Sequence, residues 1–239
     1  MDTFSFIAAG IMVYVAVAVF IGGMIYQITG WLRAPKSSVR LGLFPKPKTK
    51  TGRFFKVLKD SFLFPQSYSV DRATWIFAIV FHGSLLVILL AHFRLVREFT
   101  PIVNLLGMEG MDTLSALGGK TLGIIIIFPV LFYLFRRFIT PHKDLSVPED
   151  YFLVIILILI IAFGDHLRFF ADFHVADYRE YVQSLLVFKP FYPDAIANSD
   201  AKIVLSLHVL SVNIFVMYFP FSKLMHIIGT FAANKVRSD

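Results

Sequence analysis

The stretch "FHGSLLVILLAH", residues 81–92, places His82 and His92 ten positions apart in a segment that is otherwise free of charged residues. An ionisable group inside hydrocarbon is costly and usually has a partner or a function. A single intramembrane histidine, however, often does no more than hydrogen-bond to a neighbouring helix. Whether His82 and His92 have a function therefore depends on whether other predicted spans carry histidines at the same depths in the membrane.

The composition indicates that the protein folds within a lipid bilayer. Of the 239 residues, 57% are hydrophobic and 16% are charged, and the mean hydropathy is +0.72, which is typical of integral membrane proteins. The absence of cysteine excludes disulfides, thiolate zinc sites and cysteine-ligated iron–sulfur clusters from this chain. The net charge of +7 comes from basic residues in loops, not along one face with interleaved aromatic residues, which excludes nucleic acid as a partner.

Five apolar segments have about the 20 residues that a membrane-spanning helix needs. We expect an all-α integral membrane fold, a five-helix transmembrane bundle that forms a single membrane domain over residues 1–239. The first segment is too long for the apolar region of a signal peptide and follows Asp2 instead of a basic stretch, so we expect it to remain as a helix. The predicted spans cover residues 4–28, 75–95, 114–138, 151–172 and 203–228.

The distribution of Lys and Arg predicts the orientation. The basic loop 31–74 carries ten, the loop 136–150 three and the tail after Phe221 three, and these sixteen residues accompany six acids. The opposite loops hold the remaining seven, with nine acids or ten if Asp2 is counted. The positive-inside rule then predicts a multi-pass protein of a prokaryotic cytoplasmic membrane, with the N-terminus outside and the C-terminus in the cytoplasm.

The basic loop also contains an amphipathic pattern. In "GRFFKVLKDSFLF", residues 52–64, Phe54, Leu58 and Phe62 recur at helical spacing with charged residues between them. Such a helix suits either the membrane surface or a soluble subunit. The alternative is that the loop merely sets the topology and touches anionic lipid.

A second histidine pair, His208 and His226, falls in the last predicted span. Their separation of eighteen residues is five helical turns, which predicts one shared face and a separation of about 27 Å. His82 and His92 are about 15 Å apart on one side of their helix. We expect the break at Pro220, together with helix tilt, to absorb the difference of about 12 Å.

Two antiparallel helices that each carry a histidine near both ends can supply two opposed pairs. His82 and His226 lie toward the cytoplasm, and His92 and His208 lie toward the outside. Two opposed imidazoles are the axial ligands of a six-coordinate heme iron held between helices. The pattern predicts two stacked hemes b, and the lack of a Cys-x-x-Cys-His motif excludes the usual covalent attachment.

These residues resemble the respiratory nitrate reductase gamma subunit family of diheme cytochromes b. The resemblance rests on His-x9-His in the second span, His-x17-His in the last, "FPFSKLMHI" at 219–227 and "FRRFITP" at 135–141, and it extends from about Trp75 onward. In that family the four histidines ligate two hemes in the pairs given above. The resemblance implies that quinol, expected to be menaquinol, is oxidised near the outer heme and that electrons leave from the inner heme to a cytoplasmic iron–sulfur partner.

The long basic loop is more similar to relatives that serve complexes of sulfate-reducing organisms. In those complexes the partner is a heterodisulfide-reductase-like iron–sulfur protein, in place of one like the nitrate reductase beta subunit. A lysine that the family places near its quinone pocket has no counterpart here, where Glu109-Gly110 stands. Other groups must then contact quinone, or else serve only as interfacial charges. The candidates by position are Arg94, Arg97, Lys120, Asp165, His166 and Arg168.

Two further features belong to the same region. Gly118, Gly119 and Gly123 predict close approach of a helix or of heme. The aromatic segment "FFADFHVADYREYV", residues 169–182, predicts an outer interfacial helix that either lies on the membrane surface or covers the quinone pocket.

The sequence therefore predicts an electron-transfer subunit of an oxidoreductase complex that oxidises quinol, with the terminal chemistry on other subunits. One alternative is the reverse reaction, reduction of quinone with cytoplasmic electrons. The other is a heme-free membrane anchor or transporter in which the histidines only hydrogen-bond between helices.

Overall fold

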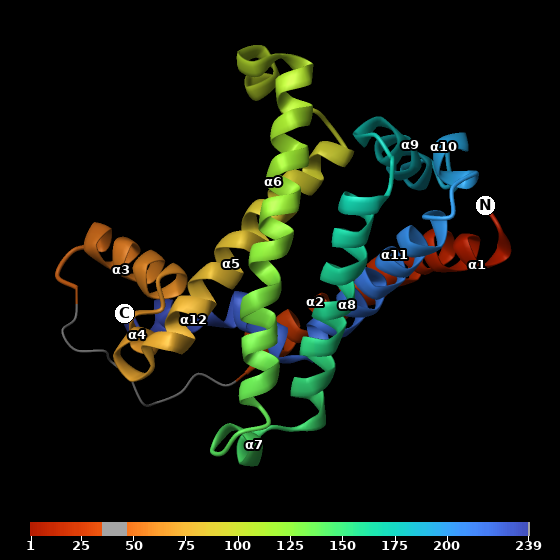
Figure 1. Cartoon of the computed structure of the whole chain (residues 1–239). Helices are drawn as coiled ribbons and strands as arrows, with labels where there is room; N and C mark the ends of the chain where they lie inside the picture. The colour runs from red at the N-terminus through yellow and green to blue at the C-terminus, as the bar shows by residue number, and fades with distance from the viewer. Residues whose placement is uncertain (35–46, 239) are drawn as a thin grey trace. The chain divides into compact units, whose positions relative to one another are not determined.

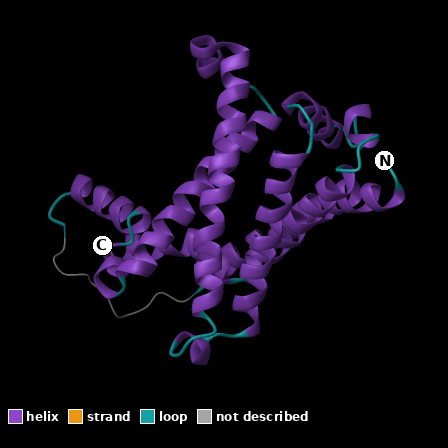
Figure 2. Cartoon of the chain, viewed as in Figure 1, coloured by secondary structure: helices purple, strands orange, loops and turns teal. Residues whose placement is uncertain are grey.

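The computed structural model describes residues 1–34 and 47–238, and every regular element within these ranges is helical (Figures 1 and 2). Residues 35–46 of the basic loop lie outside the described residues. Five helices in the described ranges are long and apolar enough to cross a membrane. The all-α membrane fold class predicted from the sequence is thus confirmed, whereas its organisation as a single membrane domain remains a prediction.

The five long helices are joined by shorter ones. The candidate spans are Thr3–Arg33, Arg72–Leu95, Thr100–Arg136, Pro148–Phe170 and Lys202–Phe221. The first comprises α1 (Thr3–Phe6), η1 (Ile7–Ile11) and α2 (Met12–Arg33), and the second α5 (Arg72–His92) and η2 (Phe93–Leu95). The third is α6 (Thr100–Arg136), the fourth α8 (Pro148–Phe170), and the fifth α11 (Lys202–Tyr218) with η3 (Phe219–Phe221). The other elements are α3 (Lys50–Phe62), α4 (Pro65–Val70), α7 (His142–Leu145), α9 (Val175–Leu186), α10 (Asp194–Ala197), η4 (Lys223–Met225) and α12 (His226–Ser238).

Helix α6 is longer than the hydropathy pattern predicts. It begins at Thr100 instead of near Leu114, and Pro101 occupies its first turn, where the missing N–H of proline costs nothing. Gly107 interrupts the helical geometry with φ 72° and ψ 172°, a conformation that glycine adopts without a steric penalty. The start signal at Thr100-Pro101 therefore extends the helix beyond the apolar run.

The last predicted span is divided, as Pro220 predicts. The α-helix ends at Tyr218, two 3₁₀ turns follow, and Ser222 between them is extended with φ −120° and ψ 175°. Proline lacks the N–H that would continue the helix. The expectation that His208 and His226 share one helical face is therefore wrong, because His226 begins the separate helix α12.

The chain forms two compact units, one of residues 1–17 with 80–216 and the other of residues 18–79 with 217–239. In the first unit α6 packs extensively against α8. Its buried core combines residues from η1, α8, α9, α10 and α11 with one residue of the loop before α10. The members of this core are Ala9, Leu167, Tyr181, Tyr192, Ile196 and Leu205.

The first span contains a π-helical segment, η1, that is used in packing. The N–H of Met12 donates to the carbonyl of Ile7, five residues back, and such a register leaves neighbouring carbonyls available. The buried amide of Asn213 donates to the Ala8 carbonyl over 3.0 Å, and the Tyr181 hydroxyl donates to the Ala9 carbonyl over 2.5 Å. The π segment thus satisfies two polar side chains that would otherwise be buried without partners.

The second unit is built around the packing of α3 on α12. Phe62 of α3 meets Phe231 of α12 edge to face, with ring centroids 5.6 Å apart. The indole N–H of Trp75, in the first turn of α5, donates to the Leu63 carbonyl over 2.7 Å. This bond ties the end of α3 to the beginning of a candidate membrane span.

Candidate functional site

Helix α5 carries His82 and His92 on one continuous run of helix, as the sequence predicts. His82 is half-buried, and its ring lies edge to face with Phe81 at a centroid distance of 5.1 Å. His92 ends the helix with an exposed side chain, and its Nδ1 lies 2.7 Å from the carbonyl oxygen of Ile88. A carbonyl oxygen can only accept, so Nδ1 of His92 is the donor.

His208 is held by a different helix. Its Nδ1 donates to the carbonyl oxygen of Ile160 in α8 over 3.0 Å. A Cβ at Gly164 would lie 3.1 Å from Cε1 of His208, so the glycine permits the close approach of the ring to α8. His208 and His92 belong to the same compact unit and lie near enough to interact electrostatically.

These bonds are those expected of heme-ligating histidines. A neutral imidazole that donates through Nδ1 carries its lone pair on Nε2, and metal-ligating histidines usually donate their other ring N–H to a carbonyl or carboxylate. Nε2 of His92 and of His208 is therefore left to act as a metal ligand, and their pairing on one heme stays a prediction. Within the described residues no group of three or more His, Cys, Asp or Glu converges as a metal site. A heme needs only two axial ligands, because its macrocycle provides the others.

His226 shows the same bond at the start of α12. Its Nδ1 donates to the carbonyl oxygen of Lys223 over 2.9 Å. The turn that presents this carbonyl is stabilised by Ser222, whose Oγ accepts from the N–H of Leu224 over 3.2 Å. His82 belongs to the first unit and His226 to the second, so their pairing stays a prediction.

Helices α6 and α8 bring three of the six quinone candidates together. Asp165 packs so closely against Gly123 that a Cβ there would overlap its carboxylate Oδ1. Arg168 lies against Gly119, and the Lys120 ammonium lies 5.5 Å from the centroid of the Phe169 ring. The close approach predicted for Gly119 and Gly123 is therefore confirmed, and side chains of α8 occupy the space that the glycines leave.

Gly118 and two of the remaining candidates lie differently. No atom of the described residues lies within 4 Å of a Cβ built at Gly118, so no helix approaches closely there, and close approach of heme at this position stays a prediction. His166 is exposed on α8, with its ring 5.1 Å from that of Phe170, and Arg97 is exposed beyond the end of α5.

The sixth candidate, Arg94, is only 2% exposed and belongs to an ion-pair network. Its guanidinium bonds Glu98 over 2.8 Å and Asp112 over 2.5 Å. Arg179 of α9 donates both to Glu98 and to the backbone carbonyl of Arg94, the latter over 3.1 Å. Hydrogen bonds from Arg94 first, and from Arg179 as well, hold the pKa of Glu98 below its usual value. Sequence reasoning missed all three partners. The spacing of four residues could have indicated Glu98, whereas no local pattern links Asp112 or Arg179 to Arg94.

Helix α9 contains only the second half of the predicted aromatic segment, because residues 171–174 are non-helical and separate it from α8; its place at the membrane interface stays a prediction. Its Tyr178 is largely buried, and burial raises the pKa of this phenol to about 12 although the charge of Arg168 acts in the opposite direction. The Tyr178 ring meets the Phe173 ring edge to face at a centroid distance of 5.6 Å. The helix also packs into the core through Tyr181.

Comparisons with known proteins agree with this architecture. The chain is 29% identical over 257 residues to the "Hdr-like menaquinol oxidoreductase cytochrome b-like subunit" of Archaeoglobus fulgidus, covering 92% of this chain and 76% of that protein. It is 27% identical over 258 residues to the subunit of the same description in Archaeoglobus profundus, with coverages of 90% and 74%. The family model "Nitrate reductase gamma subunit" matches residues 67–234, which include all four paired histidines. The chain therefore belongs to the nitrate reductase gamma subunit family.

Proposed function

We propose that the protein is a diheme cytochrome b subunit of a membrane quinol oxidoreductase, with quinol oxidised near the outer histidine pair. The observation that carries this proposal is the Nδ1 bond to a backbone carbonyl at His92, His208 and His226. Each bond fixes the ring and leaves Nε2 as the nitrogen that would ligate a heme iron. His92 and His208 would hold the outer heme, and His82 and His226 the inner one. Bound hemes b supply reversible one-electron transfer between ferrous and ferric iron.

The substrate site of this proposal is the polar group on α6 and α8. Lys120, Asp165 and Arg168 lie in or beside the interface of the two helices, and Gly164, the residue before Asp165, contacts His208. Oxidation of a quinol releases two electrons and two protons. Asp165 is a suitable proton acceptor, because the described residues offer its carboxylate no ion pair. Lys120 and Arg168 would orient the quinone oxygens.

The electrons would leave through an iron–sulfur partner on the side of the basic loop, of the heterodisulfide-reductase-like kind. The names of the two Archaeoglobus relatives support menaquinol as the substrate and favour oxidation over the reverse reaction. A heme-free anchor or transporter is disfavoured by the hydrogen bond from Nδ1 to a backbone carbonyl that three of the histidines have in common.

The test is a reduced-minus-oxidised optical spectrum with pyridine hemochrome quantitation on the purified full-length protein. We expect two hemes b per chain, with His208→Ala and His226→Ala each losing a different one. His174→Ala is the matched control, because His174 is exposed at the start of α9, and it should retain both hemes. A well-folded protein without heme would exclude the proposal.

The direction of transfer needs its own measurement. In the reconstituted complex, a menaquinol analogue should reduce both hemes, and Asp165→Asn should slow this reduction while leaving the heme content unchanged. Reduction of the hemes only from the iron–sulfur side, with quinone as the acceptor, would instead establish the reverse reaction.

A further inference from the structure

Helix α3 has an aromatic face that the second unit leaves largely exposed. Phe54, Phe55 and Phe62 are 60%, 62% and 55% exposed. At 100° per residue these side chains, with Leu58 between them, fall within roughly 100° of arc around the helix. Among the described side chains of α12, Phe231 meets this arc at the ring of Phe62. Three phenylalanines at this exposure outside a membrane span need an apolar environment.

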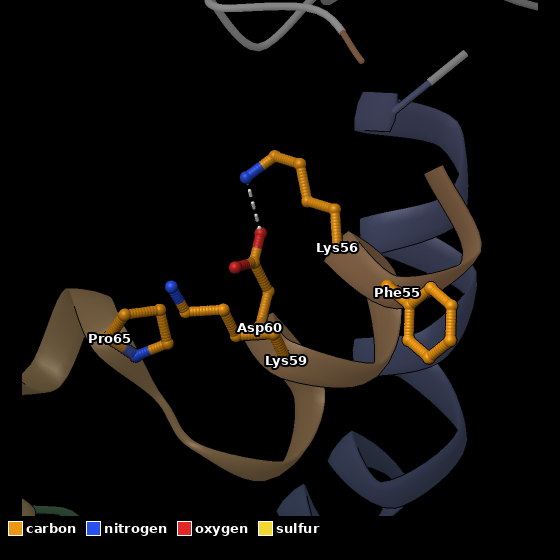
Figure 3. A pocket seen from close by; sticks show the side chains of 5 residues that line it. All are labelled: Phe55, Lys56, Lys59, Asp60 and Pro65. Atoms are coloured by element: carbon orange, nitrogen blue, oxygen red, sulfur yellow. Dashed lines mark hydrogen bonds and ion pairs between the residues drawn. The ribbon is translucent and has the colours of Figure 1, made fainter. Parts of the chain in front are cut away.

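The side of α3 next to this aromatic face is basic and hollowed. An open pocket of about 460 Å³ is lined by Phe55, Lys56, Lys59, Asp60 and Pro65. Lys56 is paired with Asp60 over 2.9 Å, and Figure 3 shows Lys59 extending from the same helix toward Pro65. In the part of the chain that the structure describes, the Lys59 ammonium has no ion pair or hydrogen bond of its own. The pocket therefore offers an uncompensated cation beside an apolar surface.

The level of α3 relative to the membrane can be inferred from its contacts with the start of α5. Trp75, three residues into α5, binds the Leu63 carbonyl, and the Tyr68 ring meets the Trp75 ring edge to face at 5.0 Å. Arg72 lies 5.5 Å from the centroid of the Tyr68 ring. Tyr, Trp and Arg together are typical of the level where a membrane span reaches the headgroups. These contacts hold the C-terminal end of α3 at that level.

We propose that α3 lies in the membrane interface and that its pocket binds the headgroup of an anionic phospholipid, with Lys59 on the phosphate and Phe54, Phe55 and Phe62 among the acyl chains. Basic helices with an aromatic face bind anionic bilayers in this orientation. The ten Lys and Arg of loop 31–74 against two acids match an anionic surface. This site is independent of the hemes and of the direction of electron transfer.

The test uses the natural absence of cysteine, which permits single-cysteine spin labels on the full-length protein in nanodiscs. Labels at F54C and F62C should collide with oxygen and be shielded from aqueous nickel chelate. A label at K56C, on the other side of the same helix, should show the reverse. In nanodiscs of phosphatidylcholine with phosphatidylglycerol the F54C label should lie deeper than in phosphatidylcholine alone, and inorganic phosphate should not reproduce the effect.

Replacing Lys59 tests the headgroup contact separately. The phosphatidylglycerol content of the nanodiscs is increased stepwise, and the midpoint is the fraction at which half of the F54C labels have moved into the bilayer. We expect Lys59→Gln to raise this midpoint about fivefold. The heme content serves as the folding control. Labels at Phe54 and Phe62 that remain open to the nickel chelate would overturn the proposal. So would labels shielded from both oxygen and nickel chelate, because a protein surface or a second copy of the chain would then cover this face.

Discussion

At the scale of single residues, one missing methyl group on α8 determines how closely His208 can approach. A Cβ at Gly164 would lie 3.1 Å from the His208 ring, and the bond to Ile160 limits how far the ring can retreat. We expect Gly164→Ala to displace the imidazole and to lower or shift the absorbance of the heme that we propose for His92 and His208. Gly118→Ala is the control, because a methyl group there would meet no atom within 4 Å. An unchanged Gly164→Ala spectrum would contradict this role.

Asp165 depends on Gly123 in the same way. A methyl group at Gly123 would overlap the carboxylate, so Gly123→Ala must push Asp165 out of the interface between α6 and α8. We expect a raised KM for the menaquinol analogue, with both hemes retained, and no change for Gly118→Ala. Steady-state kinetics of the reconstituted complex provide the measurement. Loss of heme instead of quinol binding would show that the interface serves only helix packing.

The residues of the candidate site differ in how easily they can be predicted from the sequence. The four histidines stand out because ionisable groups are rare in apolar segments, and Gly119 and Gly123 stand out because they interrupt the bulk of a span. The distant partners of Arg94 cannot be recognised from the sequence. Asp112 is 18 positions away and Arg179 is 85 positions away, and exposed charges in loops are usually solvated. Only the folded arrangement identifies this pairing.

At the scale of elements, the network of Arg94, Glu98 and Arg179 joins the end of α5 to α9. We expect Glu98→Gln to destabilise the protein by about 1–3 kcal/mol, because among the described residues it leaves the buried Arg94 with Asp112 as its only charged partner. Thermal unfolding in detergent measures the change. Glu109→Gln, at an exposed position of α6, should be neutral, and equal Tm values for the two variants would contradict the prediction.

The packing of α9 should also be sensitive to alkaline pH. Burial raises the pKa of Tyr178 to about 12, above its usual value of 10.0. The phenol thus stays protonated in the folded protein while it ionises in the unfolded chain. Its contribution to stability is complete below pH 10 and is lost as the pH rises from 10 toward 12. We expect Tm to fall over this range, and to fall less steeply in Tyr178→Phe. Identical slopes would assign the loss to other groups.

The elements themselves are largely predictable from periodicity and hydropathy, whereas their ends are not. The five apolar runs correspond to five long helices, and Pro220 marks the end of the fifth. The helical arithmetic from His208 to His226 fails because Ser222 adopts an extended conformation between two 3₁₀ turns. The early start of α6 is missed because residues 100–113 are less apolar than a span requires.

At the scale of the whole molecule, the orientation in the membrane is a prediction from charge alone. The absence of cysteine again allows a direct test with single substitutions at exposed positions. We expect a membrane-impermeant maleimide to label Asn198→Cys in intact cells. Lys143→Cys should react only after the membrane is opened, because its loop belongs to the predicted cytoplasmic side. The opposite pattern would invert the topology and place the basic loop outside.

The π segment near the N-terminus restricts how this chain can change in length. A π turn is an α-helix that has gained one residue. Removing a single residue from Ile7–Ile11 would restore the ordinary register and return the carbonyls of Ala8 and Ala9 to backbone partners. Asn213 and Tyr181 would then lose their acceptors. Substitutions at the exposed positions Ile7 and Ile11 should be tolerated, but a one-residue deletion within Ile7–Ile11 should not.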